Sequence, residues 1–325
     1  MQKSAEFPHT ADTGTSANAG AAPRTPLVVF ALLGVLVFTW GGNYTWMKLA
    51  VDDIGIWLFN ALRYLGATAI VGAVLAASSG ARHLLPLPGE RLALVAIGLL
   101  QVGVLSALIT FALQYVEASR TVLVVYTNPI WTLLLSLLLL KERTAWNQVL
   151  GLMLGLAGLA ILTNPLAMTW TTASLAGVAM ALLGTMAWAL ASVLYKRRTW
   201  RSTFGQQLFV QLLACLIASV PLALWFDWNT PVRSTETLSL VLLWNMIGPT
   251  ALGYWVWAVV LSRVSAASAT QVLLLSPIYG MLQSHIVLGE PLGPAILGAA
   301  ACVVCGALLT FWQPRRKRYP PPPLR

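Results

Sequence analysis

Long apolar stretches separated by short polar segments fill the chain from residue 27 to residue 312. The hydrocarbon core of a bilayer is about 30 Å thick, so a membrane-spanning helix needs about 20 predominantly apolar residues. Charged residues interrupt this sequence at nearly that interval. The pattern therefore predicts ten membrane-spanning helices, at residues 27–47, 54–79, 92–116, 121–140, 145–163, 174–195, 202–226, 237–262, 264–289 and 292–312.

Composition agrees with an all-α membrane protein and excludes a water-soluble enzyme. Hydrophobic residues make up 58% of the 325 residues and charged residues only 9%, whereas soluble domains carry about 25% charged residues. The net charge of +10 could suggest nucleic acid, but with ten spans sixteen of the twenty Lys and Arg residues fall on one side. Because basic residues favour the cytoplasmic side, we expect both termini in the cytoplasm and the helices in a bacterial inner membrane.

The two ends lie outside the predicted bundle. Residues 1–26 are rich in Ala, Thr, Gly and Ser, which is typical of a disordered cytoplasmic tail, and residues 313–325 form a basic, proline-rich cytoplasmic tail. Cys302 and Cys305 have the spacing of some metal sites, but no second cysteine pair or histidine partner accompanies them. We interpret them as small packing residues and expect no metal and no cofactor.

The chain repeats itself with one constant offset of 148 residues, which relates Trp40 to Trp188, Lys48 to Lys196, Pro129 to Pro277, Glu142 to Glu290 and Gly158 to Gly306. We therefore expect two halves of five spans each, residues 27–164 and 174–312. An odd number of spans makes the second half enter the membrane from the opposite face. Such inverted repeats are characteristic of secondary transporters, which hold substrate in a central cavity and work by alternating access.

Three elements carry a resemblance to a known family. Each half has a tryptophan late in its first helix and a proline-bearing fourth helix that ends at a glutamate, and the first half has Leu62-Arg63-Tyr64 in its second helix. With ten spans, these elements resemble the drug/metabolite transporter superfamily, in particular its EamA-type members, over about residues 27–312. The second half departs by having Gln211 in place of Arg63. The resemblance implies export of amino acids and related metabolites, aromatic amino acids among them, although other members handle cationic drugs, sugars or nucleotide sugars.

Polar and aromatic residues gather on one face of the first predicted helix of each half. Trp40, Asn43 and Tyr44 stand at i, i+3 and i+4, and Trp188 and Ser192 stand at i and i+4. An amide or a phenol is costly where it faces lipid, so these faces are expected to line the cavity and bind substrate. For any one residue, a hydrogen bond between helices is the alternative to substrate contact.

Arg63 is the one charge well inside a predicted span. A charge inside the membrane costs at least a few kcal/mol by insertion scales and is by default a functional hypothesis. Arg63 could hold a substrate carboxylate or act as a gate latch. Alternatively it could bind backbone carbonyls or pair with Asp52 or Asp53.

Pro129 and Pro277 interrupt the fourth helix of each half, and each frees a carbonyl four residues upstream, at Val125 and Leu273. Such a carbonyl needs a polar partner or a wet cavity. We interpret the paired prolines as hinges. The glutamates at the ends of these helices, Glu142 and Glu290, are interpreted as gate contacts. Further substrate-binding candidates lie beside the prolines and on the third helix of each half: Tyr126, Asn128, Ser276, Tyr279, Gln101 and Tyr254.

The sequence contains no plausible nucleophile–base pair, phosphate-binding loop or acidic residue in the middle of a span. The expected function is a secondary transporter that exports small metabolites, foremost neutral or aromatic amino acids, without coupling through a membrane carboxylate. Multidrug efflux and a non-transporting membrane scaffold or assembly factor are the alternatives. The expected partners are a small-molecule substrate and lipid, not nucleic acid, and the oligomeric state is left open, a monomer included.

Overall fold

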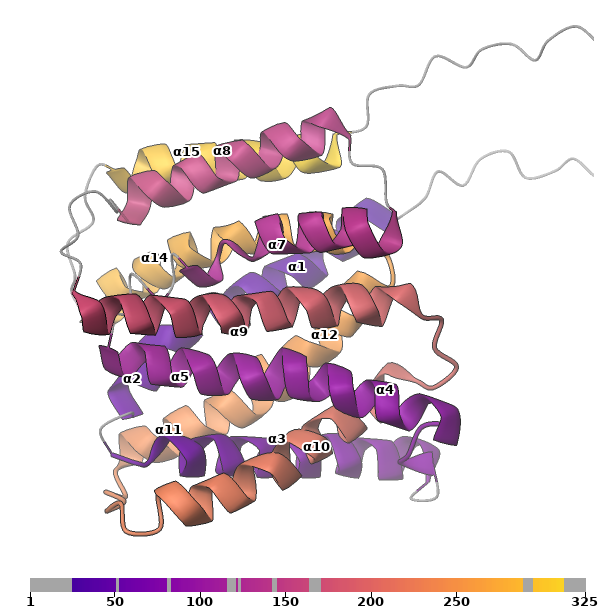
Figure 1. The fold of residues 1–325 in the computed structure, drawn as a ribbon, viewed down its shortest axis with the longest axis vertical. Helices are drawn as coiled ribbons and strands as arrows, with labels where there is room; N and C mark the ends of the chain where they lie inside the picture. Colours follow the sequence, from indigo (N-terminus) through magenta and orange to yellow (C-terminus); the bar gives the residue numbers. More distant parts are fainter. Residues whose placement is uncertain are drawn as a thin grey trace, which may run out of the picture.

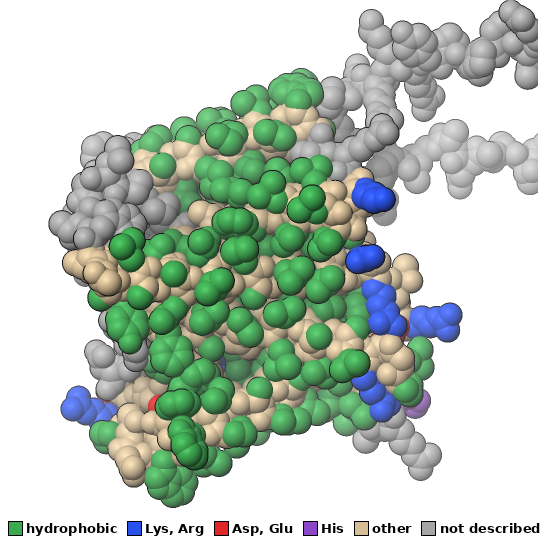
Figure 2. Space-filling model, in the orientation of Figure 1, with side chains coloured by type: hydrophobic (Ala, Val, Ile, Leu, Met, Phe, Trp, Pro, Cys, Tyr) green, Lys and Arg blue, Asp and Glu red, His purple; other side chains and the backbone are tan. Residues whose placement is uncertain are grey.

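The computed structural model describes residues 25–50, 53–80, 83–115, 121, 124–141, 145–163, 171–288 and 295–312. Within these ranges every regular element is a helix, and the helices lie side by side in one bundle (Figure 1). Apolar side chains cover most of the face shown in Figure 2, and Lys and Arg side chains collect mostly along one edge of it. An apolar surface of this extent fits contact with lipid.

Up to residue 163 the elements are α1 (Thr25–Gly41), α2 (Asn43–Ala50), α3 (Ile56–Ser79), α4 (Pro88–Gly98), η2 (Leu99–Val104), α5 (Leu105–Tyr115), α7 (Asn128–Leu135), η3 (Ser136–Leu140) and α8 (Trp146–Thr163). From residue 172 they are α9 (Thr172–Arg197), α10 (Phe204–Phe226), α11 (Glu236–Asn245), η5 (Met246–Leu252), α12 (Gly253–Leu261), α13 (Ala266–Val272), η6 (Leu273–Leu275), α14 (Ser276–Leu288) and α15 (Ala295–Phe311). Of these, η2, η3 and η5 are π-helical and η6 is a 3-10 helix.

Side-chain caps determine where two of the long helices begin. At the start of α9, the Thr171 hydroxyl accepts from the Ser174 backbone N–H, and the Ser174 hydroxyl accepts from the Thr171 backbone N–H. Thr203 and Gln206 form the same reciprocal pair at the start of α10. A cap satisfies N–H groups that have no partner inside the helix and contributes about 1 kcal/mol. Both helices therefore begin within two residues of the predicted spans.

The all-helical class is confirmed, because each predicted span is predominantly helical over its described residues. In the part of the chain that the structure describes, four helices are long and apolar enough to cross a membrane by length and composition: Ile56–Ser79, Pro88–Ala112, Thr172–Arg197 and Phe204–Phe226. Other apolar helices among the described residues are shorter, Leu27–Gly41 and Trp146–Ile161 among them. The count of ten spans and their inverted arrangement stay predictions.

The first predicted span is wrong as one continuous helix. The α1 helix ends at Gly41, Gly42 forms a turn and α2 begins at Asn43. The interruption coincides with a close crossing of α1 and α14. A Cβ atom on Gly41 would lie 2.6 Å from the Ser276 carbonyl oxygen, and one on Gly280 would lie 2.6 Å from the Gly41 carbonyl oxygen. Only glycine lets the two backbones approach this closely.

Equivalent helices of the two repeats make equivalent contacts. The α3 helix packs on α10 and α8 packs on α15, and each pair joins two equivalent helices. The α1 helix packs on α14 and α12, and its equivalent α9 packs on α7 and α5. The π-helical segments also correspond, since η2 ends at Val104 and η5 ends at Leu252, 148 residues later. A two-fold relation between the halves would produce this set of pairs.

Glycines bring α8 and α15 into backbone contact. A Cβ atom on Gly306 would lie 2.5 Å from the Gly151 carbonyl oxygen, whereas one on Gly298 of the same helix would have no heavy atom within 4 Å. We expect Gly306→Ala to lower the melting temperature of the purified protein, because overpacking costs roughly 1–3 kcal/mol. Gly298→Ala is the matched control and should leave it unchanged or slightly higher, since alanine has the better helix propensity. Equal melting temperatures for the two variants would contradict this contact.

Candidate functional site

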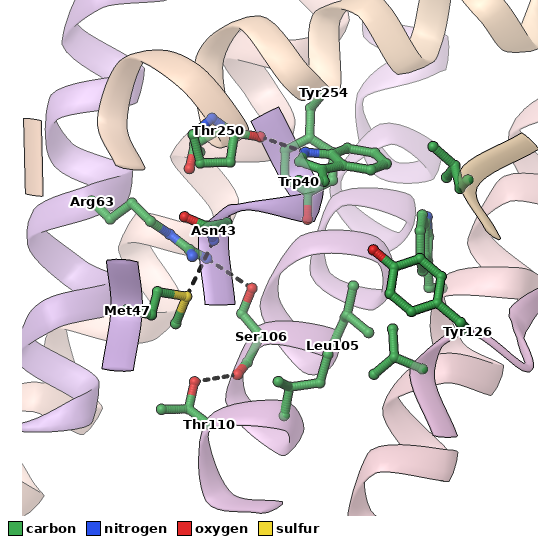
Figure 3. A pocket seen from close by; sticks show the side chains of 15 residues that line it. Trp40, Asn43, Met47, Arg63, Leu105, Ser106, Thr110, Tyr126, Thr250 and Tyr254 are labelled. Carbon is green, nitrogen blue, oxygen red and sulfur yellow. Dashed lines mark hydrogen bonds between the residues drawn. The ribbon is translucent and has the colours of Figure 1, made fainter. Parts of the chain in front are cut away.

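A cavity of about 90 Å³ lies between the two repeats. This volume is several times the roughly 10–15 Å³ that one water molecule requires. The first repeat supplies Trp40, Asn43, Met47, Arg63, Leu105, Ser106, Ile109, Thr110, Val125 and Tyr126, and the second supplies Trp188, Pro249, Thr250, Tyr254 and Leu273. Figure 3 shows Arg63, Asn43 and Met47 on one side of the cavity and Tyr126 on the other.

Arg63 extends from α3 to the cavity wall and is only 5% exposed. Its Nη2 donates to Ser106 Oγ at 2.8 Å and to Tyr64 Oη at 3.1 Å. Its Nε has no hydrogen-bond partner, and the guanidinium makes no ion pair with a carboxylate of the described chain. Burying an unpaired charge is costly, so this guanidinium presents the cavity with a strong, incompletely satisfied donor.

The pairing of Arg63 with Asp53, one of its predicted alternatives, is not formed. The Asp53 carboxylate accepts instead from the Thr235 hydroxyl at 2.9 Å, and the Asp53 carbonyl oxygen accepts from the Arg233 backbone N–H. Asp53 therefore binds the segment that precedes α11 and does not pair with Arg63. Asp52 lies outside the described residues.

Asn43 and two hydroxyls complete the polar side. Asn43 is half-buried, and its Nδ2 donates to Met47 Sδ at 3.2 Å while its Oδ1 has no partner in the described chain. The Thr110 hydroxyl donates to the Ser106 carbonyl oxygen, one helical turn earlier, at 2.6 Å. Buried polar atoms in native proteins nearly always have a partner. The free Asn43 Oδ1 is therefore positioned to accept from water or a ligand.

Four rings, Trp40, Trp188, Tyr254 and Trp257, form an aromatic cluster beside the polar side. The Trp40 ring centroid lies 5.5 Å from that of Trp188, 5.4 Å from that of Tyr254 and 5.8 Å from that of Trp257. The Trp40 Nε1 donates to the Pro249 carbonyl oxygen at 2.9 Å (Figure 3). Tilted and edge-to-face contacts of this kind are favoured between aromatic rings. The cavity thus joins an apolar aromatic surface to a cationic, hydrogen-bonding one, which suits a small amphipathic molecule.

Both prolines of the predicted hinges stand in the first turn of a new helix. The α7 helix begins one residue before Pro129, after a two-residue turn, and α14 begins one residue before Pro277, after the 3-10 helix η6. Proline is tolerated there because its missing N–H would have no partner in the helix. Val125 and Leu273, whose carbonyls the prolines were expected to free, both line the cavity. The hinge role itself stays a prediction.

Six of the predicted substrate-binding residues come together on the cavity wall: Trp40, Asn43, Arg63, Tyr126, Trp188 and Tyr254. They come from separate elements, so spacing along one helix could not have shown that they meet. Their substrate-binding role stays a prediction.

Asn128 and Ser192 lie off the cavity wall and make structural hydrogen bonds. Asn128 Nδ2 donates to the Thr185 carbonyl oxygen at 3.3 Å, which joins α7 to α9. Ser192 Oγ donates to the Trp188 carbonyl oxygen at 3.0 Å, within α9. For these two residues the structure shows the alternative role of bonding within or between helices.

Gln101, Ser276 and Tyr279 also lie off the cavity wall. Gln101 and Ser276 are buried, and Gln101 Nε2 and Ser276 Oγ have no partner in the described chain. Tyr279 is half-buried, with its ring centroid 5.5 Å from that of Phe38. The remaining predicted residues, the Tyr44 side chain, Glu142 and Glu290, lie outside what the structure describes.

Sequence reasoning missed three hydroxyl residues of the cavity wall, Ser106, Thr110 and Thr250. Ser106 and Thr110 stand at i and i+4 in a predominantly apolar helix, which places them on one face. That signal could have found them. Thr250 lies in the π-helical segment η5, where regular helical spacing does not apply.

Hydrogen bonds link several elements at the end of the bundle where α9 ends. Lys196 Nζ donates to the carbonyl oxygens of Leu261 at 3.2 Å and Val264 at 2.5 Å, at the C-terminus of α12. Near the same end, Glu90 of α4 accepts from the Ser202 hydroxyl at 2.5 Å. These contacts join α9, α12, α4 and the segment before α10.

A second cavity of about 10 Å³ shares Met47 and Thr110 with the first and reaches Ile54, Ile56 and Phe59 near the start of α3. In Figure 1 the start of α3 lies at the opposite end of the bundle from the end of α9. The main cavity therefore continues away from the Lys196 and Glu90 contacts.

Within the described residues, no group of three or more His, Cys, Asp or Glu side chains could hold a metal ion. Cys302 is half-buried and Cys305 is exposed.

Comparisons with known proteins agree with the sequence motifs. The uncharacterized transporter YoaV of Bacillus subtilis is 26% identical over 89% of this chain and 100% of its own length. The probable terminal-alkyne amino-acid exporter of Streptantibioticus cattleyicolor is 25% identical over 86% of this chain and 92% of its own. A solved crystal structure has the same fold, with a TM-score of 0.73 over 87% of this chain and 96% of that one, at 21% identity.

The family signature is found twice in the chain. The EamA-like transporter family matches residues 27–164 and again residues 175–312. These matches cover most of the sequence and confirm the resemblance seen in the tryptophan, arginine and proline motifs. The chain belongs to the EamA-like transporter family, and it is an integral membrane transporter and not an enzyme.

Proposed function

We propose that this transporter exports small carboxylate-bearing metabolites, foremost neutral and aromatic amino acids, across the bacterial inner membrane. The observation that carries the proposal is Arg63, a buried cation on the cavity wall with a free Nε and no ion pair to a described carboxylate. Arginine binds carboxylates well because its planar fork of donors matches their two oxygens. A substrate carboxylate would supply the missing anion.

Asn43 and the aromatic cluster support an amino acid as the substrate. The free Oδ1 of Asn43 can accept a hydrogen bond from an α-ammonium group, and Figure 3 shows Asn43 beside the Arg63 guanidinium. The aromatic cluster offers a neutral or aromatic side chain an apolar surface. The similar protein named as a probable terminal-alkyne amino-acid exporter supports the same class.

The proposed mechanism is alternating access between two inverted five-helix halves, residues 27–164 and 174–312. The constant offset of 148 residues, the equivalent helix contacts and the two family matches support this division. The basic edge in Figure 2 supports cytoplasmic termini, because Lys and Arg favour that side.

We expect flux without proton coupling. Among the described residues, the side chains that line the cavity include no Asp, Glu or His, whereas proton-coupled transporters usually carry such groups along their pathway. The initial rate of amino-acid flux into proteoliposomes should therefore be the same with and without an imposed pH gradient. A rate that collapses when a protonophore is added would contradict this expectation.

The test of the proposed function is uptake into liposomes that hold the purified protein, compared with protein-free liposomes. L-phenylalanine, L-tryptophan, L-threonine and a cationic dye are offered separately, and the proposal expects flux of the amino acids and not of the dye. Flux of the dye alone would support multidrug efflux, and no flux of any compound would support a membrane scaffold. Either of these results would overturn the proposal.

A further inference from the structure

The two symmetry-related tryptophans of the cavity have different hydrogen-bond partners. Trp40 Nε1 donates to the Pro249 carbonyl oxygen at 2.9 Å. Trp188, 148 residues later, is only 5% exposed and lines the same cavity, but its Nε1 has no partner in the described chain. An indole N–H is a donor only, and a buried tryptophan N–H usually finds a partner. The free N–H of Trp188 therefore needs an explanation.

The sequence difference between the repeats explains why Trp188 has no equivalent bond. Trp40 reaches η5 because Gly253 leaves room for its ring: a Cβ atom on Gly253 would lie 2.5 Å from Trp40 Nε1. The equivalent of Gly253, 148 residues earlier, is Leu105, whose buried side chain lines the cavity. A leucine at this position blocks the approach that Trp40 makes in the other half.

The carbonyl that would accept from Trp188 by symmetry belongs to Gln101, which is 148 residues before Pro249. Gln101 is buried in η2, and no bond from Trp188 to it is formed. The hydrogen bond that joins α1 to η5 is thus present in the structure. The equivalent hydrogen bond between α9 and η2, on the other side of the pseudo-symmetric cavity, is absent.

We propose that Trp40 is a positioning residue, whereas the Trp188 indole N–H is a ligand donor that selects substrates with a hydrogen-bond acceptor in the side chain. This inference rests on the proposed function, because the substrate carboxylate is assigned to Arg63. A phenol oxygen, a carbonyl oxygen or a neutral pyridine nitrogen would accept from Trp188, whereas a plain phenyl ring would leave the N–H unsatisfied. Leaving a buried donor unpaired weakens binding, so the acceptor should improve affinity about tenfold.

The experiment compares two ligands of nearly identical shape, 3-(4-pyridyl)-L-alanine and L-phenylalanine, at slightly alkaline pH, where the pyridine is neutral and the α-ammonium group is still protonated. Dissociation constants are measured by calorimetry for the purified wild type, Trp188→Phe and Trp40→Phe. The wild type should bind pyridylalanine about tenfold more tightly than phenylalanine. Trp188→Phe should remove this preference, whereas Trp40→Phe should keep it, whatever each substitution does to overall affinity. For each protein the result is the ratio of the dissociation constants of the two ligands. Both substitutions remove part of an indole ring and so weaken binding of both ligands, and this common effect cancels in the ratio.

Leu105→Gly provides a second variant, since it copies Gly253 and leaves Trp188 in place. It should let Trp188 approach the Gln101 carbonyl and so reduce the preference for pyridylalanine. Binding of both ligands to the wild type without preference, or an unchanged preference in Trp188→Phe, would overturn the assignment of Trp188 and leave the proposed function standing. If neither ligand binds the wild type while both fail to be transported, the proposed function falls and this inference falls with it.

Discussion

Arg63→Gln should lower amino-acid flux in proteoliposomes by at least about 30-fold. Glutamine keeps a polar side chain of moderate length but removes the positive charge that would balance a substrate carboxylate. Truncating one partner of a buried, hydrogen-bonded charge pair costs about 2–5 kcal/mol, which corresponds to binding weaker by about 30-fold to several thousandfold. Flux of L-phenylalanine at subsaturating concentration is the measurement, and it should fall by at least 30-fold.

Two further variants separate substrate binding from a general effect of charge. Arg63→Lys keeps the charge without the planar fork, so it should retain part of the flux. Arg197→Gln removes an exposed charge at the end of α9 and should leave flux unchanged. Because Arg63 also donates to Ser106 and Tyr64, melting temperatures must show that Arg63→Gln still folds. A folded Arg63→Gln protein with flux within twofold of the wild type would remove Arg63 from the site.

The sequence predicted the apolar helices and the main cation of the cavity, because both depend on residue type and length alone. An arginine inside a membrane span is costly whichever helix carries it, so the sequence alone was enough to single out Arg63. Spacing along the predicted first span also placed Trp40 and Asn43 on one face, and both line the cavity, although they lie in two separate helices, α1 and α2. These inferences needed only local periodicity.

Tertiary contacts determine which polar residues line the cavity and which bond to another helix, and spacing along the sequence could not predict this. Asn128 and Asn43 are both amides in apolar helices, yet Asn128 bonds to the Thr185 carbonyl and Asn43 lines the cavity. The difference depends on which helix packs opposite each one, and a single sequence does not contain that information. For the same reason Gln101 could not be told apart from residues of the cavity wall.

Local backbone geometry was the second feature that the sequence could not predict. The apolar stretch 27–47 has the length of one helix, but the crossing of α1 and α14 at Gly41 interrupts it. The π-helical segments η2 and η5 likewise lie inside stretches that read as regular helices. Pro249 in η5 gives a sequence signal for the irregularity, whereas η2 contains no proline. Interruptions of this kind re-aim side chains, and π-helical turns often occur at functional sites.

Lys196→Met should reduce flux about tenfold while leaving substrate affinity nearly unchanged. Lys196 joins the end of α9, which carries Trp188, to the C-terminus of α12, which carries Tyr254. Its ammonium suits a helix C-terminus because the exposed carbonyls there carry partial negative charge. Methionine keeps the apolar stem and removes the donor. Each hydrogen bond from a charged group contributes about 1.5–3 kcal/mol, so the closed end should open far more often.

Frequent opening at this end would disturb the proposed alternating access without touching the cavity, because in that mechanism one end stays closed while the other is open. The Ser262 amide donates to the Ala258 carbonyl at the end of α12. In Lys196→Met its hydrogen exchange should accelerate at least tenfold. The dissociation constant of L-phenylalanine should change less than threefold. Arg198→Gln is the matched control: Arg198 is exposed and donates to the Gly89 carbonyl oxygen at the same end, and its loss should change flux little. If Lys196→Met lowers affinity and flux together, Lys196 supports the cavity itself and the closure of this end depends on other contacts, Glu90 with Ser202 first among them.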